Sequence, residues 1–197
     1  FYYPPQQKYG ALGHMVCDTD TAQAVDVKEG RIVDAPIIQV NPGQKGRPGE
    51  KISNFQGTEI LGTIEYNTNY GIFGTLLRLP DSGLFPQPVP VAPASQVHPG
   101  PAEILTVLEG DRVERFRIEI LKVSPRARRD GKGMLIKICD EDLIRRAGGI
   151  IQGMSGSPII QDGKLVGAVT HVLVNDPLRG YAVFSEWMLE EAGLWPQ

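Results

Sequence analysis

Alternation of apolar and polar residues along the chain predicts many short strands. Residues 116–120 alternate between large apolar and charged side chains, which is typical of a strand with one buried face. This strand is expected to pair with residues 103–108 across the polar turn at 109–112. A second hairpin is expected at residues 159–166, where apolar pairs flank an Asp-Gly turn. The pattern therefore predicts antiparallel β-structure in this half of the chain.

Other apolar segments extend this pattern, and helix is expected in one place. Further strands are predicted at residues 134–138, 165–174 and 181–184. Helical spacing occurs at residues 185–192, where Ser185 can cap the first turn, Trp187 and Met188 can be buried, and Gly193 can end the helix. Residues 41–48, rich in Gly and Lys, are expected to form a surface loop. We therefore expect an all-β fold with a short C-terminal helix.

Composition and length suit a two-barrel β-structure. The chain has 197 residues with 23 glycines and 16 prolines, which suits many strands and tight turns, and 41% hydrophobic residues can build a full core. One peptidase-sized domain of two halves, roughly 1–85 and 100–197, is expected, joined by a Pro-rich connection at residues 80–101. The chain begins in mid-pattern at Phe1, so we interpret it as a fragment of a longer protein.

Charge and residue spacing exclude several classes of function. A net charge of −3 without a basic stripe argues against a nucleic-acid partner. No apolar run approaches the roughly 18 residues of a membrane span. The two cysteines and three histidines lack metal-ligand spacing, so neither a metal nor a cofactor is expected. Cys17 and Cys139 are expected to be free thiols rather than a disulfide.

The segment 153–158, Gly-Met-Ser-Gly-Ser-Pro, carries the strongest chemical signal. Ser155 lies between glycines that leave room for a substrate backbone. The amides of Gly153 and Ser155 can then converge on one point, as an oxyanion hole requires. Apolar strands flank the turn on both sides, whereas the Gly-x-Ser-x-Gly elbow of α/β-hydrolases is absent. This pattern resembles the nucleophile turn of chymotrypsin-like serine proteases.

A nucleophilic serine needs a neighbouring base to take its proton. His98 lies in a Pro-rich stretch and is expected in an exposed loop. His171 lies on the apolar strand after the serine, where it and Thr170 can line a substrate pocket, although the histidine can equally be satisfied inside the barrel. His14 follows a small-residue apolar segment near the start of the chain. Its place well before Ser155 favours His14 as the general base.

Longer segments make the resemblance specific. The blocks at residues 9–14 (YGALGH), 148–160 (GGIIQGMSGSPII), 167–172 (GAVTHV) and 174–177 (VNDP) resemble the SpoIVB peptidase family of endospore formers, and residues 70–75 and 101–107 are similar to it as well. The resemblance covers essentially the whole chain. It implies a chymotrypsin-like double β-barrel with a catalytic serine.

The resemblance also implies a biological setting. Members of this family are serine endopeptidases that transmit a sporulation signal by cleaving a membrane-bound regulatory protein. This cleavage releases an intramembrane protease that processes a sigma factor precursor. Self-cleavage, an extracytoplasmic location between the mother-cell and forespore membranes, and an N-terminal membrane segment followed by a PDZ domain are also implied. The alternative function is a catalytically silent module that keeps the fold and regulates a partner protein.

The acid that orients the imidazole is less clear from the chain. By resemblance Asp140 is the acid of the catalytic triad with His14 and Ser155, and it ends a predicted strand. Asp140 can equally cap a short helix through residues 143–146 that ends at Gly148. Asp142 is the nearest rival for the acid, and Asp18 and Asp20 are further candidates because they closely follow His14.

Overall fold

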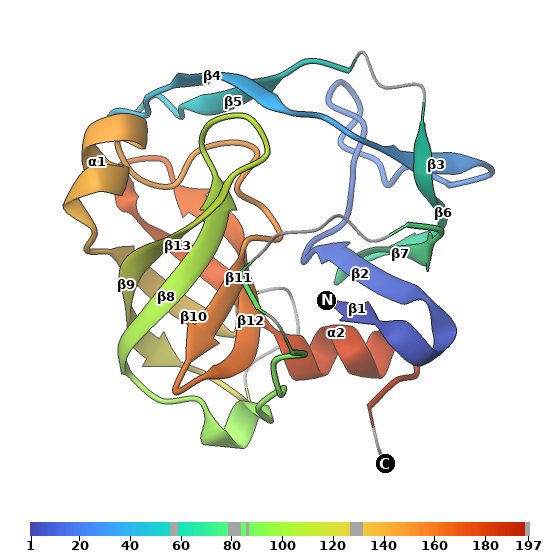
Figure 1. Cartoon of the computed structure of the whole chain (residues 1–197). Coiled ribbons are helices and arrows are strands. Elements are labelled where there is room, and N and C mark those ends of the chain that lie inside the picture. The colour runs from blue at the N-terminus through green and yellow to red at the C-terminus, as the bar shows by residue number, and fades with distance from the viewer. Residues whose placement is uncertain (56–58, 79–83, 86, 127–131, 196–197) are drawn as a thin grey trace.

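The computed structural model describes residues 1–55, 59–78, 84–85, 87–126 and 132–195. The protein has two β-rich halves side by side, with the C-terminal barrel on the left of Figure 1 and the N-terminal sheet on the right. The fold is all-β with a short C-terminal helix, as the sequence predicts, and the described residues contain a second short α-helix before the Ser155 turn. A two-stranded ribbon crosses above both halves in the same view.

The C-terminal half is a closed six-stranded barrel with the order β10-β13-β12-β11-β8-β9. Its strands are β8 (Gly100–Val107), β9 (Val113–Val123), β10 (Met134–Ile138), β11 (Pro158–Gln161), β12 (Lys164–Leu173) and β13 (Asp176–Phe184). Both predicted hairpins are confirmed, since β8 pairs with β9 and β11 pairs with β12 in antiparallel register. The turn of the second hairpin has positive φ at Asp162 and Gly163, as a tight two-residue turn requires.

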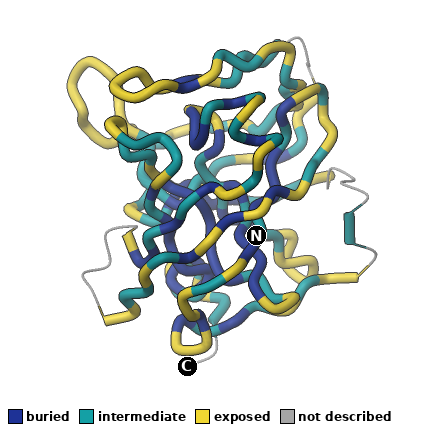
Figure 2. The backbone as a smooth tube through the Cα atoms, turned by 90° about the vertical axis from the view of Figure 1, so that its left-hand side faces the viewer, coloured by how far each residue is buried: buried dark blue, intermediate teal, exposed yellow. Residues whose placement is uncertain are grey.

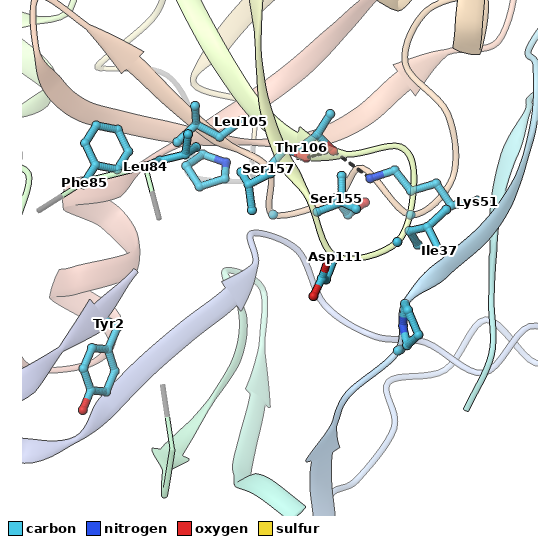
Figure 3. A pocket seen from close by; sticks show the side chains of 18 of the residues that line it. Tyr2, Ile37, Lys51, Leu84, Phe85, Leu105, Thr106, Asp111, Ser155 and Ser157 are labelled. Atoms are coloured by element: carbon cyan, nitrogen blue, oxygen red, sulfur yellow. Dashed lines mark hydrogen bonds between the residues drawn. The ribbon is translucent and has the colours of Figure 1, made fainter. Parts of the chain in front are cut away.

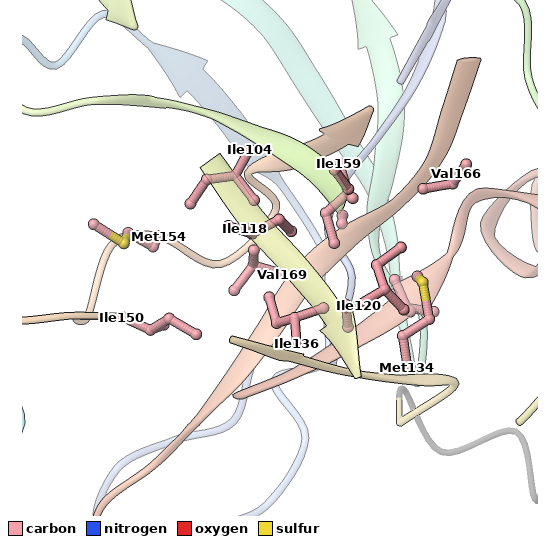
Figure 4. Packing of buried hydrophobic residues seen from close by; sticks show 14 of the residues in the cluster. Ile104, Ile118, Ile120, Met134, Ile136, Ile150, Met154, Ile159, Val166 and Val169 are labelled. Atoms are coloured by element: carbon pink, nitrogen blue, oxygen red, sulfur yellow. The ribbon is translucent and has the colours of Figure 1, made fainter. Parts of the chain in front are cut away.

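The core of the protein fills this barrel. Alternate residues of β9, namely Phe116, Ile118 and Ile120, are buried, while the charged residues between them are exposed. Isoleucine, valine and methionine side chains from all six strands meet in the interior (Figure 4). The tube in Figure 2 shows the same contrast, because buried segments gather in the lower part of the molecule and exposed ones lie at its margins. The alternation of apolar and charged residues along β9 therefore arises because one face of the strand packs into the barrel core and the other faces solvent.

The N-terminal half contains a five-stranded sheet and a separate ribbon. The sheet has the order β1-β2-β7-β6-β3, which does not close on itself among the described strands. Its strands are β1 (Tyr2–Tyr3), β2 (Lys8–Leu12), β3 (Gly30–Val33), β6 (Ile60–Thr68) and β7 (Gly71–Leu76). The ribbon consists of β4 (Ile37–Asn41) and β5 (Glu50–Ser53).

The ribbon β4–β5 ties the two halves together. The Gly43 amide, in its connecting turn, donates to the Ala147 carbonyl at 2.8 Å. The Ile37 amide donates to the Gly110 carbonyl, which lies between β8 and β9, also at 2.8 Å. Residues 42–49 form the loop expected at 41–48, with Asn41 at the end of β4.

Two helices accompany the strands. Helix α2 (Ser185–Glu191) follows β13, with Trp187 and Met188 buried as predicted. The predicted cap is wrong: Phe184 occupies the N-cap position without a side-chain hydrogen bond, and Ser185 is a buried first residue of the helix. The strand continues to Phe184 because that ring is fully buried against Trp187. Helix α1 (Glu141–Ala147) is the short helix after β10.

Part of the Pro-rich connection lies outside the described residues, which omit 79–83 and 86. The described part runs along the barrel beside β12. The Ala92 amide donates to the Leu165 carbonyl at 3.0 Å, and the Leu165 amide donates to the Pro90 carbonyl at 2.8 Å. A 3₁₀ turn, η2 (Ala94–Gln96), precedes β8, the first strand of the barrel. A second 3₁₀ turn, η1 (Pro4–Gln6), connects β1 and β2.

Candidate active site

His14 is presented by a turn at the end of β2. Leu12 and Gly13 both have positive φ, at 69° and 75°, a conformation that is unfavourable for leucine. A Cβ atom on Gly13 would lie 2.9 Å from the side chain of Val183 and 3.0 Å from that of Thr170. Glycine is therefore required here both for the backbone conformation and for close packing against β12 and β13. This contact places His14 against the other half of the protein.

Ser155 lies in a tight turn before β11. Gly153 and Gly156 have φ values of 88° and 84°, which glycine adopts without strain. The Gly156 amide donates to the Val169 carbonyl of β12 at 2.8 Å, so the turn is fixed to the barrel. The buried Met154 side chain anchors the turn in the core. Strand β11 follows the turn, as expected, but the strand expected before it is wrong. Ile150 and Ile151 are buried in the connection between α1 and β11 and belong to no strand.

The two residues meet across the junction of the halves. The Nε2 atom of His14 lies 2.9 Å from the Oγ atom of Ser155. The Nδ1 atom of His14 lies 2.9 Å from the carbonyl oxygen of Met15. Because a carbonyl oxygen only accepts hydrogen bonds, Nδ1 carries the proton, and in the neutral ring Nε2 is then the acceptor. This tautomer can take the proton of Ser155 Oγ, as a general base must.

The Ser155 hydroxyl has a second neighbour. Its Oγ atom lies 3.1 Å from the carbonyl oxygen of Thr170. A hydroxyl has one proton to donate, so His14 and Thr170 are alternative acceptors for it. Donation to His14 is the arrangement that increases the nucleophilicity of the oxygen.

The amides of Gly153 and Ser155 flank the nucleophile. Among the described residues, neither of these two N–H groups donates to a protein acceptor. The neighbouring residue Gln152 is fixed by the start of β5 and the residue before it: its amide donates to the Gly49 carbonyl, and its carbonyl accepts from the Lys51 amide at 3.0 Å. The ribbon therefore holds the turn from outside while leaving two N–H donors beside Ser155. Such donors can stabilise an oxyanion.

Asp140 caps helix α1 and does not contact His14. Its Oδ1 atom accepts from the amides of Asp142 and Leu143 at 3.0 and 3.3 Å. Its Oδ2 atom accepts from the Arg117 amide at 3.2 Å. Burial acts to raise the pKa of Asp140, but these hydrogen bonds outweigh it and the pKa lies below its ordinary value. The structure places Asp140 in the capping role and does not bring it together with His14 and Ser155.

The rival carboxylates are also engaged away from His14. Asp142 pairs with Arg145 and Arg146 on its own helix, and Asp18 accepts from Thr21 in a local turn. No carboxylate among the described residues hydrogen-bonds to His14. The Met15 carbonyl fixes the tautomer of the ring in this structure. It does not supply the negative charge with which an aspartate stabilises the imidazolium.

His171 and Thr170 lie beside the nucleophile. They line a cavity of about 200 Å³ together with Ser155 and residues 150–152 of the preceding loop. The ring of His171 is centred 5.0 Å from the ring of His14, tilted by 43°. The His171 residue is exposed, whereas Thr170 is buried. The side chain of His171 thus faces the site and not the barrel interior.

A larger cleft was not predicted from the sequence. It has a volume of about 710 Å³ and is lined by both halves, including Ser155, Gly153 and the half-buried Lys51 (Figure 3). Burial lowers the pKa of Lys51 to about 8. The loop expected at residues 41–48 ends before Lys51, and the sequence analysis assigned no role to this residue, because nothing local indicates that it packs beside a turn about 100 residues later in the chain.

Other features bear on the class of protein. Cys17 and Cys139 are both free and exposed, as expected. No cluster of three or more metal-binding side chains occurs in the part of the chain that the structure describes. Within the same residues, neither α-helix has the length and apolar character needed to cross a membrane.

Several solved structures are similar to this chain. Among solved structures, the chain is similar to the active form of the protease Rv3671c from M. tuberculosis, at 16% identity and a TM-score of 0.48, covering 77% of this chain and 65% of that one. A serine-to-alanine mutant of Rv3671c in an inactive form gives 16% identity and a TM-score of 0.48, covering 74% and 70%. The chain thus spans about two thirds of the length of the first of these structures. No curated protein sequence matches it.

The decisive match is to a family model. The model described as SpoIVB peptidase S55 matches residues 1–189, which leaves only the last residues of helix α2 and the C-terminus outside it. This chain therefore belongs to the SpoIVB peptidase S55 family.

Proposed function

We propose that this chain is the peptidase domain of a sporulation signalling protein, with Ser155 as nucleophile and His14 as general base. The observation that carries the proposal is the 2.9 Å contact between His14 Nε2 and Ser155 Oγ. Ser155 attacks the scissile carbonyl while His14 takes its proton, and His14 then returns a proton to the leaving amine. The amides of Gly153 and Ser155 bind the developing oxyanion.

The natural substrate that we propose for this peptidase domain is a membrane-bound regulatory protein. Its cleavage allows an intramembrane protease to process a sigma factor precursor, and the enzyme cleaves itself as well. Membership in the SpoIVB peptidase family supports this setting. The same membership supports an extracytoplasmic location between the mother-cell and forespore membranes, with attachment through a segment that precedes this domain in the full protein.

The residues around the dyad have separate roles in this proposal. The His171 side chain and the strand at Thr170 receive the substrate residue before the scissile bond, since both line the cavity beside Ser155. The domain comprises residues 1–197, with halves at roughly 1–85 and 100–197. The role of Asp140 as the triad acid stays a prediction, and it requires the carboxylate to exchange its cap contacts for His14.

Covalent labelling tests the proposal directly. A fluorophosphonate probe should modify Ser155 in the folded protein, and mass spectrometry should locate the adduct on the peptide that contains it. His14→Ala should abolish labelling while the protein remains folded, because the unassisted hydroxyl is a poor nucleophile. Failure to label the wild-type protein would favour the alternative function, a silent module that binds a partner.

A further inference from the structure

Lys51 places a positive charge inside the cleft beside the nucleophile. Its Nζ atom donates to Thr106 Oγ1 at 2.7 Å, and Thr106 also accepts from Ser157 Oγ at 3.1 Å. Thr106 and Ser157 are both buried. Figure 3 shows the Lys51 side chain reaching toward Thr106 next to Ser155. The amine is therefore held at a fixed place in the cleft rather than extended into solvent.

The aliphatic part of the Lys51 side chain also packs on Gly153, in the turn that carries Ser155. A Cβ atom built on Gly153 would lie 3.1 to 3.3 Å from the Cβ, Cγ and Cδ atoms of Lys51. The Lys51 amide is fixed as well, because it donates to the Gln152 carbonyl at 3.0 Å. Backbone, stem and amine are thus all positioned against the residues that surround Ser155. A side chain held in this way loses little further freedom when it binds a ligand.

The Lys51 ammonium lacks an anionic partner. No carboxylate among the described residues forms an ion pair with it, and Thr106 is the acceptor it contacts. Asp34 and Asp111 line the same cleft, but both are exposed and neither bonds to Lys51. Burying a cation without a counter-ion lowers stability. A cation retained in such a place is suited to an anionic group of a ligand.

On the proposed function, the cleft lies on the leaving-group side of the nucleophile. There the cavity at His171 and Thr170, which Ser155 also lines, receives the substrate residue before the scissile bond. The larger cleft also contains Ser155 but continues toward β8 and the ribbon. A peptide that passes Ser155 from the first cavity therefore enters the second with the residues that follow the scissile bond.

We propose that Lys51 binds a carboxylate in the part of the substrate that follows the scissile bond, and so selects substrates that are acidic there. The inference rests on the proposed peptidase function. Apolar side chains, including Ile37, Leu84, Phe85 and Leu105, form much of the remaining cleft wall. The preferred segment therefore combines an acidic group near the cut with an apolar residue beyond it. The carboxylate belongs either to an Asp or Glu side chain or to a free chain terminus.

A cleavage survey gives the first test. Wild-type protein, Lys51→Met, Lys51→Arg and Lys45→Met are each incubated with a proteome-derived peptide library, and cut sites are read by mass spectrometry. Lys45 is the matched control, because it lies exposed on the same ribbon and outside the cleft. Wild type, Lys51→Arg and Lys45→Met should be enriched in Asp and Glu just after the cut, and Lys51→Met should lose this enrichment. Equal enrichment in Lys51→Met would overturn the proposal.

Binding to an inactive background separates this inference from the peptidase function. In Ser155→Ala protein, a peptide with Glu after the cut site should bind about tenfold more tightly than its Gln counterpart, a ratio typical of one charged hydrogen bond. The ratio should fall toward one in Ser155→Ala/Lys51→Met. Amidated and free-acid versions of each peptide distinguish a side-chain carboxylate from a chain terminus. A ratio that Lys51→Met does not change contradicts the proposal, whether or not the wild-type protein cleaves.

Discussion

Gly156 lies directly against the backbone of Leu12, so that a Cβ atom at Gly156 would be 2.7 Å from the Leu12 nitrogen and 3.0 Å from its Cα atom. Leu12 ends β2 two residues before His14, and Gly156 follows Ser155. The absence of a side chain at Gly156 therefore sets how closely the strand carrying the base approaches the turn carrying the nucleophile. The geometry of the dyad depends on a glycine that takes no part in the chemistry.

Gly156→Ala should lower the rate of Ser155 labelling and of peptide cleavage by about 10²-fold, because displacement of a catalytic group by about 1 Å has an effect of this size. The methyl group must push Leu12, and with it His14, away from Ser155. Labelling kinetics with a fluorophosphonate measure this change.

Gly163→Ala is the matched control for this prediction. Gly163 also has a positive φ, 74°, but no atom lies within 4 Å of a Cβ built there. Both variants carry the backbone strain of alanine at positive φ, whereas only Gly156→Ala adds the contact with Leu12. A similar loss of activity in both variants would assign the effect to strain and not to the position of His14.

Ser155→Ala should fold normally and lose peptide cleavage by about 10⁴-fold or more. His14→Ala should show a similar loss, and the double variant should be only slightly worse, because the two residues act as a unit. Values of kcat/KM for one peptide across the three variants give the comparison. Near wild-type cleavage by Ser155→Ala would remove Ser155 from the mechanism, and additive losses would show that His14 acts elsewhere.

Asp140→Asn distinguishes the two roles of Asp140. Asparagine caps helices about as well as aspartate, so on the contacts that Asp140 makes with Asp142 and Leu143 the variant should keep kcat within about tenfold of wild type. Asp140→Ala should lose the cap and about 1 kcal/mol of stability. A fall in kcat near 10⁴ in Asp140→Asn, with unchanged stability, would instead identify Asp140 as the triad acid.

The strands of the C-terminal half and the dyad could be predicted because their signals are local, whereas none of the strands β1 to β7 was predicted. Alternation at residues 116–120 reports one buried face, and the Asp162-Gly163 turn fixes a hairpin. The glycines around Ser155 indicate a tight turn with an accessible hydroxyl, as the nucleophile of a serine protease requires. His14 then follows by elimination among three histidines.

The remaining features could not be read from local sequence. The segment at Asp140 suits both a helix cap and a triad acid, and only its contacts with Arg117 and helix α1 separate the two. The cap of α2 was placed one residue late, because the boundary depends on tertiary packing of Phe184. Lys51 was missed because its environment is assembled from β5, β8 and the Ser155 turn, which are distant in the chain.

Lys51→Met should raise the free energy of unfolding at pH 7 by on the order of 1 kcal/mol, because it removes a partly buried charge that lacks a counter-ion. Burial lowers the pKa of Lys51 to about 8 in the folded protein, against about 10.4 in the unfolded chain. Between these values the unfolded chain binds more protons, so wild-type stability rises with pH.

The advantage of Lys51→Met should accordingly be full below pH 8 and should shrink as the pH rises toward 10.4. Urea unfolding of both proteins at pH 7, 9 and 10 measures the difference, in which the titration of other groups cancels. Lys45→Met, at an exposed position, should show no such pH-dependent gap. A variant that is less stable than wild type at every pH would mean that the Thr106 hydrogen bond outweighs the cost of burying the charge.

His171→Ala should change which substrates are cleaved more than it changes the reactivity of Ser155. His171 lines the cavity beside Ser155 and can donate a hydrogen bond to a polar side chain such as Gln or Glu before the scissile bond. We expect kcat/KM for the preferred peptide to fall by about tenfold or more, with a smaller change in labelling by a reagent that carries no side chain.

The ring centroids of His171 and His14 lie 5.0 Å apart, so His171→Ala also removes a ring that packs beside the base. His171→Phe separates the two effects, because phenylalanine keeps a ring against His14 but cannot donate a hydrogen bond to the substrate. If His171 selects the substrate, both variants should lose the preference for a polar residue before the cut. If it supports His14, His171→Ala alone should slow labelling and peptide cleavage equally, and His171→Phe should restore both. Peptide-library cleavage and labelling kinetics on the two variants therefore decide between selection of the substrate and positioning of the base.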